Sequence, residues 1–245
     1  MDTTAIQRAL VALGYSLVVD GAMGPKTRAA LQTFQRGAGL AADGVVGPLT
    51  AGALQRAIAK KGAAAQQAAG GQIPADWMPD AQMNRVVIHW TAGAHRASGL
   101  DRSHYHILIE GDGKLVRGIP SIDLNDARGA KPGYAAHTLN CNTGSIGVSL
   151  CCMAGAEESP FKAGSAPMTR EQWDMLPKVL AELCRRYGIP VTPRTVLSHA
   201  EVQGTLGIKQ RGKWDISRLA FDPSVVGAQS CGDDFRSRTR SSLGF

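Results

Sequence analysis

The sequence lacks features that mark several large classes of protein. No part of its 245 residues approaches the roughly 20 consecutive apolar residues that span a bilayer, so we expect no membrane insertion. The five cysteines form no Cys-x-x-Cys pair, and we therefore expect neither a disulfide framework nor a cysteine-based zinc site. Residues 1–14 carry no basic segment before an apolar core, so we expect no secretory signal peptide and synthesis in the cytoplasm.

Aromatic residues and clustered positive charge are also scarce. Aromatic side chains make up 5% of the chain, and the basic residues are scattered along it. The sequence therefore does not favour nucleic-acid binding, although its net charge of +7 suits another anionic partner such as an acidic surface or a cell-wall polymer. A hydrophobic content of 44% and a charged content of 19% are typical of a globular protein, and the length allows one large or two modest domains.

An internal repeat occupies the first sixty residues. The pattern Leu-x-x-Asp-Gly-x-x-Gly-Pro-x-Thr is present at residues 17–27 and again at residues 40–50. Asp-Gly favours a turn that tolerates positive φ, and Gly-Pro places proline at the first position of a helix. Together with apolar residues at helical spacing, the repeat predicts three helices, at about residues 4–13, 25–36 and 48–60.

A segment of low complexity follows the repeat. Residues 61–80 are rich in Ala, Gln and Gly and end in prolines, which is typical of a linker. The alanines at 63–69 are compatible with a helix that Gly70 and Gly71 would break. We therefore expect a helical domain at residues 1–62, a linker at 63–80 and a second domain at 81–245.

The second domain mixes strands with helices. Short apolar or β-branched runs predict strands: a run from Arg85 that ends in His89, and residues 105–110, 114–117, 145–150 and 194–197. Thr169 and Gln172 form a capping box at the start of a helix that ends at Tyr187, and Pro177 predicts a kink in it or a later start. This mixture favours an α/β domain with one central sheet.

Two of these predicted strands deliver a histidine at or just after their ends. His89 and His199 are these residues, and Asp215 follows His199 in the next loop. Two neutral imidazoles and a carboxylate suit Zn²⁺, and three protein ligands leave a fourth position open, as in catalytic sites. On spacing alone, however, a chance arrangement of packed histidines explains the pattern as well.

The second domain also carries ordered motifs between residues 84 and 219: VVIHWTAG, SHYHILIEGDGKLVRGI, AHTLNCNTGSIGVSL, LSHAEV and GKWD. These resemble the motifs of the zinc-dependent N-acetylmuramoyl-L-alanine amidases, a family that includes phage amidases and the peptidoglycan recognition proteins. The repeat resembles the peptidoglycan-binding domain of many bacterial and phage cell-wall hydrolases, although a generic helical bundle would use the same turns. The resemblance implies an α/β amidase domain, with a mixed central sheet flanked by helices, after a small all-α three-helix peptidoglycan-binding domain.

The resemblance also implies roles for individual residues. His89, His199 and Asp215 match the zinc ligands of the family. Lys213 matches a lysine that stabilises the oxyanion, because an ammonium group supplies positive charge where negative charge develops. Tyr105 matches a tyrosine that faces the attacking water and can orient it or the scissile carbonyl. The alternatives are a solvated lysine and a tyrosine packed in the core.

Further residues have weaker assignments. His137 matches a family position near the substrate, and we expect Thr91 to bind substrate as well. Ser149 stands where certain relatives have a glutamate, and a serine cannot serve as a carboxylate base. The final proton donor is therefore open between Tyr105, the metal-activated water and the substrate. We expect His104 and His106 to be structural.

The implied function is hydrolysis of peptidoglycan at the amide bond between N-acetylmuramic acid and L-alanine. The absent signal peptide, the wall-binding repeat and the basic charge favour a monomeric phage endolysin that reaches the wall through a membrane-permeabilising partner. A non-catalytic peptidoglycan-binding protein is one alternative, although such proteins typically lose the third ligand. A muropeptide-recycling amidase is another, against which the wall-binding repeat argues.

Overall fold

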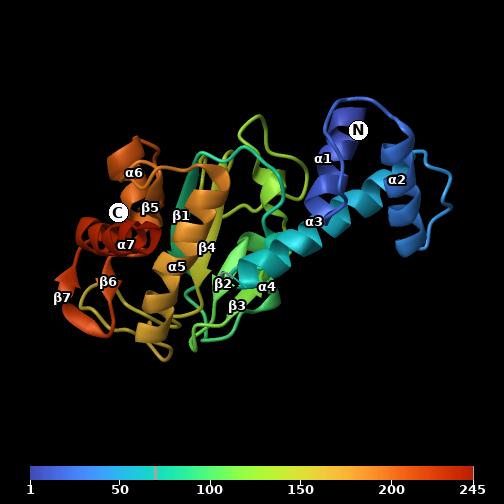
Figure 1. Ribbon diagram of the computed structural model, residues 1–245. Helices are drawn as coiled ribbons and strands as arrows, with labels where there is room; N and C mark the ends of the chain where they lie inside the picture. The colour runs from blue at the N-terminus through green and yellow to red at the C-terminus, as the bar shows by residue number, and fades with distance from the viewer. Residues whose placement is uncertain (69–70, 245) are drawn as a thin grey trace. The chain divides into compact units, whose positions relative to one another are not determined.

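The computed structural model describes residues 1–68 and 71–244 (Figure 1). The chain divides into two compact units, Met1–Asp76 and Trp77–Phe245, called here the N-terminal and C-terminal units. The third helix of the N-terminal unit continues beyond its expected end near residue 60 and reaches Ala68. The expected break at Gly70 lies outside the described residues.

The N-terminal unit is a three-helix bundle. Its helices are α1 (Thr3–Leu13), α2 (Pro25–Gly37) and α3 (Pro48–Ala68). The Asp2 carboxylate accepts a hydrogen bond from the Ala5 N–H (2.7 Å) and caps α1, while Pro25 begins α2 as the repeat predicts. One leucine from each helix is fully buried at the centre: Leu10, Leu31 and Leu54.

A buried glutamine from the preceding helix fixes each repeat turn. Gln7 donates its amide to Asp20 Oδ1 (2.6 Å), and the Gly21 N–H donates to Gln7 Oε1 (2.8 Å). The second turn repeats the arrangement, with 2.7 Å between the Gln35 amide nitrogen and Asp43 Oδ1. The carboxylates of both repeat aspartates are therefore already hydrogen-bonded within their own loops. Neither glutamine belongs to the repeated sequence pattern that predicted the turns.

The C-terminal unit is built on a mixed five-stranded sheet in the order β3-β2-β4-β1-β5. Its strands are β1 (Arg85–Trp90), β2 (Ile107–Ile109), β3 (Leu115–Arg117), β4 (Ser145–Leu150) and β5 (Val196–Ser198). The β2–β3 pair is the predicted antiparallel hairpin, and the other neighbours are parallel. The central strands β1 and β4 are almost entirely buried, as is typical of parallel strands in the middle of a sheet.

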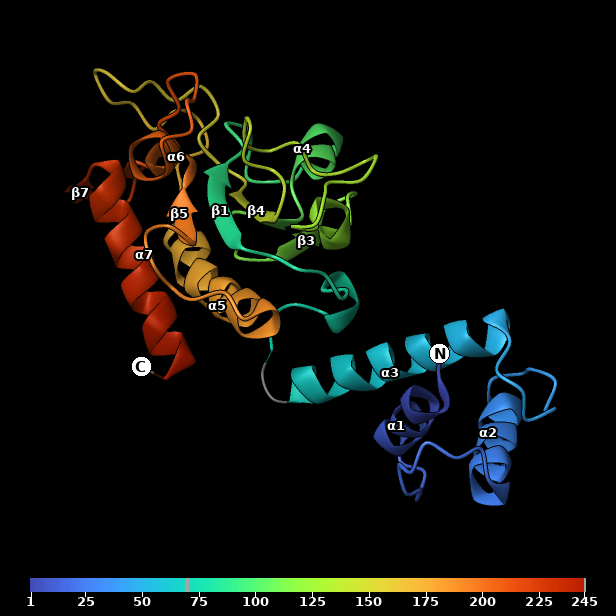
Figure 2. The ribbon, with the colours of Figure 1, turned by 90° about the horizontal axis from the view of Figure 1, so that it is seen from above.

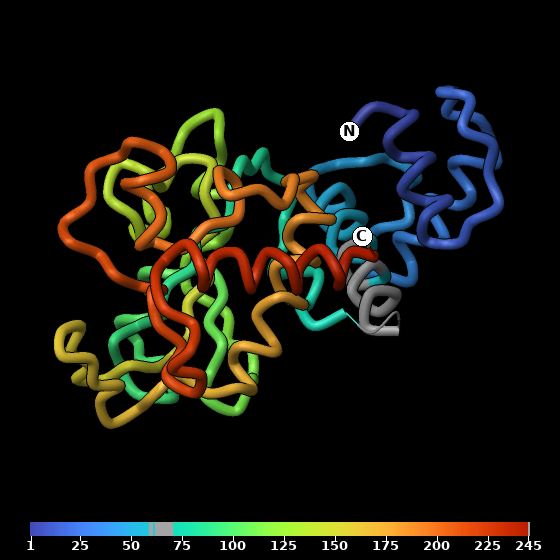
Figure 3. Tube along the Cα trace, turned by 90° about the vertical axis from the view of Figure 1, so that its left-hand side faces the viewer, coloured from blue at the N-terminus to red at the C-terminus, as the bar shows by residue number. Residues whose placement is uncertain are grey.

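The helices of this unit are α4 (Gly99–His104), α5 (Arg170–Tyr187), α6 (His199–Leu206) and α7 (Ala228–Leu243), and a two-stranded ribbon joins β6 (Arg218–Leu219) to β7 (Asp222–Val226). The predicted capping box starts α5 at Arg170, so Pro177 lies inside the helix and does not delay its start. Figures 1 and 2 show α5 and α7 side by side along one face of the sheet, and α7 is nearest the viewer in Figure 3. Within the described part of the chain, no helix is long and apolar enough to cross a membrane.

Candidate active site

Three side chains meet at one edge of the sheet. His89 lies near the end of β1, and His199 begins α6 directly after β5, the parallel neighbour of β1. Asp215 follows α6 in the next loop, and its carbonyl accepts a hydrogen bond from the Ala200 N–H (2.7 Å), which holds the loop against the start of the helix. The sheet topology therefore places the two histidines together, and the backbone hydrogen bond of Asp215 brings its carboxylate next to them.

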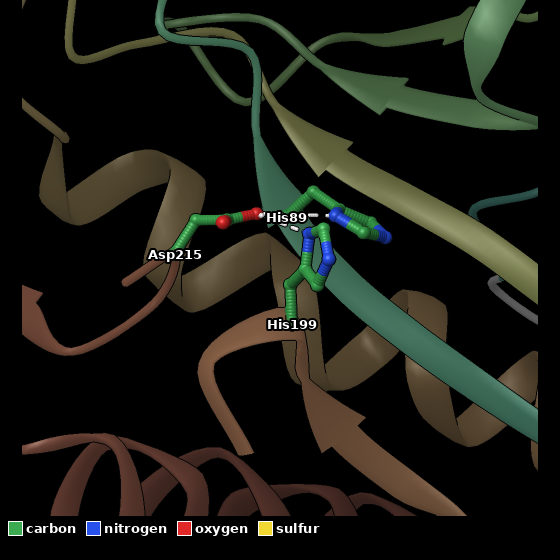
Figure 4. Close-up of side chains that lie close together, drawn as sticks. All are labelled: His89, His199 and Asp215. Carbon is green, nitrogen blue, oxygen red and sulfur yellow. Dashed lines mark hydrogen bonds and ion pairs between the residues drawn. The ribbon is translucent and has the colours of Figure 1, made fainter. Parts of the chain in front are cut away.

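Figure 4 shows the three side chains pointing toward one another. One possible ligand atom from each residue lies within 4.8 Å of the others. Asp215 Oδ2 lies 3.1 Å from His89 Nδ1 and 3.3 Å from His199 Nδ1. The three residues implied by the resemblance are thus brought together in a geometry that can hold a metal ion.

The surroundings favour the protonation states that metal ligands need. Burial lowers the pKa of His89 to about 4, despite the opposing hydrogen bond to Asp215. Burial acts to raise the pKa of Asp215, but the contacts of its carboxylate with His199 and His89 outweigh this and lower it. At neutral pH, His89 is therefore a neutral imidazole and Asp215 an ionised carboxylate, the forms that bind divalent metals.

Tyr105 lies beside this cluster. Its ring centroid is 5.1 Å from that of His89. Burial raises the pKa of Tyr105, and the negative charge of Asp215 acts in the same direction. The phenol therefore keeps its proton at neutral pH and is available as a hydrogen-bond donor. Ser149 on β4 is the register partner of His89 on β1, so the two side chains lie on the same face of the sheet.

His137 lies behind His89. Its Nδ1 is 3.2 Å from His89 Nε2, and the residue is 7% exposed. It also lines a neighbouring pocket, so the structure places it in contact with both His89 and the accessible surface. Thr91 is placed differently, because its hydroxyl accepts a hydrogen bond from the Gly93 N–H (3.1 Å) in the loop after β1 and it does not line that described pocket.

The pocket next to the cluster has a volume of about 450 Å³. Its lining includes His137, His199, Gln210 and Lys213. Lys213 is exposed, and its positive charge contributes to the low pKa of His89. A cavity of this size next to convergent polar groups is the usual form of a small-ligand site. The pocket is therefore the candidate position for the reacting part of a substrate.

Sequence analysis missed one buried residue of this site. Gln210 is 7% exposed, and its Oε1 lies 3.0 Å from His199 Nε2. A glutamine in an irregular loop has no periodicity or capping pattern that would single it out. Only the folding of the loop after α6 back toward His199 brings Gln210 into contact with that histidine.

Comparisons with known proteins agree with this geometry. The family model described as N-acetylmuramoyl-L-alanine amidase matches residues 79–215, and that of a peptidoglycan binding domain matches residues 2–54. A search of curated proteins gives no match.

Similar solved structures include N-acetylmuramoyl-L-alanine amidase LysC from Clostridium intestinale URNW, which is 16% identical, with 53% of this chain and 88% of that chain covered and a TM-score of 0.33. The Ph2119 endolysin from the Thermus scotoductus MAT2119 bacteriophage is 16% identical, with 57% and 82% covered and a TM-score of 0.37. AmiD from E. coli, in complex with the substrate anhydro-N-acetylmuramic acid-L-Ala-D-gamma-Glu-L-Lys, is 23% identical, with 54% of this chain and 55% of that chain covered and a TM-score of 0.33.

Because these TM-scores are low, the family assignment rests on the family model. Since that model covers more than half of the 245 residues, the chain belongs to the N-acetylmuramoyl-L-alanine amidase family.

Proposed function

We propose that this protein is a zinc-dependent peptidoglycan amidase that cleaves the bond between N-acetylmuramic acid and L-alanine. The observation that carries the proposal is the convergence of His89, His199 and Asp215 within 4.8 Å beside a pocket that Lys213 also lines. The non-catalytic alternative requires no such cluster. A three-residue set of this kind is typical of a catalytic rather than a structural zinc site.

The donor chemistry of the cluster fits Zn²⁺. Two imidazole nitrogens and one carboxylate oxygen are ligands that zinc accepts readily, and three protein ligands leave one coordination position open. When bound, zinc polarises the scissile carbonyl and increases the acidity of the attacking water. His89, His199 and Asp215 would hold it.

Two further residues would act on the substrate. Lys213 would place its ammonium group near the carbonyl oxygen, where negative charge develops as the amide is attacked. Tyr105, which burial keeps protonated, would donate a hydrogen bond that orients the water or the carbonyl. His137 would contact the bound substrate from the wall of the pocket and would also support His89.

The N-terminal unit would hold the enzyme on the polymer. Binding of residues 1–62 to peptidoglycan raises the local concentration of the catalytic unit and adds no chemistry of its own. Because Asp20 and Asp43 are hydrogen-bonded inside their loops, the exposed apolar side chains of these loops, such as Val18 and Val45, are the surface that we expect to contact the polymer. This division of labour suits a monomeric phage endolysin that reaches the wall from the cytoplasm.

Mass spectrometry of digested sacculi tests the proposal. The zinc-loaded protein should release stem peptides with a free L-alanine amino group and glycan strands with unsubstituted muramic acid. Chelator-treated protein and the Asp215→Ala variant serve as controls and should release neither product. Cleavage of a glycosidic bond or of a bond inside the stem peptide, with the muramic acid–alanine bond intact, would contradict the proposed reaction.

A further inference from the structure

The two histidines of the cluster share an orientation. Each turns Nδ1 toward Asp215 and has its Nε2 within hydrogen-bond distance of a polar group on the other side. A neutral imidazole carries one hydrogen, so it can offer a lone pair at Nδ1 only if that hydrogen is on Nε2. Whatever contacts Nε2 therefore decides whether Nδ1 can bind a metal.

The amide of Gln210 has one possible orientation. Its nitrogen lies 3.0 Å from the Leu139 carbonyl oxygen and 3.3 Å from the Ile208 carbonyl oxygen. Both carbonyls can only accept hydrogen bonds, so the NH₂ group faces them and Oε1 faces His199. Since Oε1 can also only accept, His199 Nε2 must carry the hydrogen in this contact.

Gln210 is itself held by the neighbouring helix. Its backbone N–H donates to Gln203 Oε1 on α6 (2.8 Å), and its amide reaches Leu139 in the loop that follows His137. The backbone and side chain of Gln210 together therefore link its loop to α6 and to the loop after His137, next to His199. A group fixed in this way keeps its orientation without a ligand in the pocket.

His89 depends on different partners. Its Nε2 lies 3.2 Å from His137 Nδ1 and 3.3 Å from the Thr138 hydroxyl. His137 Nε2 lies 3.4 Å from the Ser145 carbonyl oxygen, which can only accept, so His137 Nδ1 is left as an acceptor. Two groups, His137 and Thr138, therefore contact Nε2 of His89, whereas Gln210 is the group that contacts Nε2 of His199.

We propose that Gln210 is a positioning residue that keeps His199 in its Nε2–H tautomer and so presents Nδ1 to the zinc ion. The inference rests on the proposed zinc site. Asp215 favours the opposite tautomer in the absence of metal, because its carboxylate would accept a hydrogen from Nδ1. Gln210 opposes this competing hydrogen bond.

Two substitutions separate this role from simple packing. Gln210→Met keeps the length of the side chain and removes its hydrogen-bonding groups, including the acceptor for His199. Gln203→Met is the matched control, because it makes the same chemical change in a residue that holds the same loop without touching His199. The full-length protein is used throughout.

The first measurement is the ¹⁵N spectrum of the histidine side chains in metal-free protein, at a mildly alkaline pH where an ordinary imidazole is neutral. Gln210→Met should shift His199 from Nε2–H toward Nδ1–H, whereas Gln203→Met should not. The second measurement is the zinc affinity, from competition with a chelator. Loss of the partner of a ligating histidine typically lowers metal affinity by about 10–100-fold, and we expect a loss of this size in Gln210→Met only.

Several results would overturn the proposal. Gln210→Met could retain both the tautomer balance and the zinc affinity of the wild type, or Gln203→Met could lose as much affinity as Gln210→Met. If Gln210→Met does not fold, the wild-type spectrum decides, because His199 found only as the Nδ1–H tautomer excludes the role. A wild-type protein that binds zinc with the expected tautomer but leaves the amide bond intact would contradict the proposed function and not this inference.

Discussion

Arg236 and Glu201 form a buried ion pair between α7 and the first turn of α6. The guanidinium makes two contacts with the carboxylate, Nη1 to Oε2 (3.1 Å) and Nη2 to Oε1 (2.9 Å). Glu201 Oε2 also accepts a hydrogen bond from the Ser198 N–H (2.8 Å), directly before His199. The C-terminal helix, which lies beyond the span matched by the amidase family model, therefore fixes the element that carries one of the candidate zinc ligands.

Arg236→Met should destabilise the C-terminal unit strongly. Removing one partner of a buried pair leaves the other charge uncompensated, which typically costs about 3–5 kcal/mol. The matched control is Arg238→Met on the same helix, whose ion pairs with Asp174 and Asp234 are partly exposed and contribute about 1 kcal/mol or less. Denaturant unfolding of both variants checks the difference. Equal losses in the free energy of unfolding would mean that the buried pair contributes no more than the partly exposed pairs.

Lys213 and Asp215 should affect different steps, although both lie next to the pocket. Asp215→Ala removes a ligand and should abolish both zinc binding and amide cleavage. Lys213→Ala removes positive charge that acts only where negative charge develops, so turnover should fall by about 100-fold, as for loss of one such stabilising group, while the zinc content stays near one ion per chain. Metal analysis together with kinetics on a soluble muropeptide separates the two. Loss of zinc from Lys213→Ala would show instead that the lysine maintains the site.

Local signals account for the part of the fold that the sequence predicted. The capping box at Thr169 and the glycine at 188 delimit α5, and the repeated Gly-Pro pairs start α2 and α3. Such signals act within a few residues of each other and can be read without knowing the fold. The three converging candidate ligands were identified through the resemblance of their motifs, since spacing alone left a chance arrangement open.

The features that were missed depend on contacts between distant segments or on weak patterns. Gln210 matters only because its loop returns to His199, and Gln7 only because its helix faces the Asp20 turn. The helix α4 is an exception, because it was missed although the capping box of Ser98 and Asp101 is a local signal. In α7 the buried residues Cys231 and Phe235 are four apart, but few apolar residues surround them, so no stripe was visible.

The stability of the C-terminal unit should fall as the pH decreases from about 6.5 to 4. Burial lowers the pKa of His106 to about 4 from an ordinary value of 6.5, although its hydrogen bond to Asn125 opposes the shift. In this window the unfolded chain binds a proton that the folded chain excludes, so the free energy of unfolding decreases with falling pH, by an amount on the order of 3 kcal/mol for this group. Burial lowers the pKa of His89 and His137 as well, and both act in the same direction.

His106→Gln isolates the contribution of that residue. Denaturant unfolding of metal-free protein across this pH range should show a shallower dependence in His106→Gln than in the wild type. His104→Gln is the control, because it makes the same change in a neighbouring histidine that is exposed. An unchanged pH dependence in His106→Gln would exclude His106 as a source of the acid sensitivity.

The glutamine that fixes the second repeat turn should be required for the stability of the N-terminal unit. Gln35→Leu leaves the Gly44 N–H, now 2.9 Å from Gln35 Oε1, without its acceptor, and a buried unpaired group of this kind costs about 1–3 kcal/mol. Hydrogen exchange in full-length protein should show a protected Gly44 amide in the wild type and faster exchange in the variant. Gln32→Leu makes the same change on α2 at a partly exposed position and should alter stability by only about 0.5 kcal/mol.

Because the turn belongs to the proposed wall-binding unit, Gln35→Leu should also weaken binding to sacculi while cleavage of a soluble muropeptide stays unchanged. Equal exchange rates at Gly44 in the two variants would mean that the repeat turn holds its shape without the glutamine.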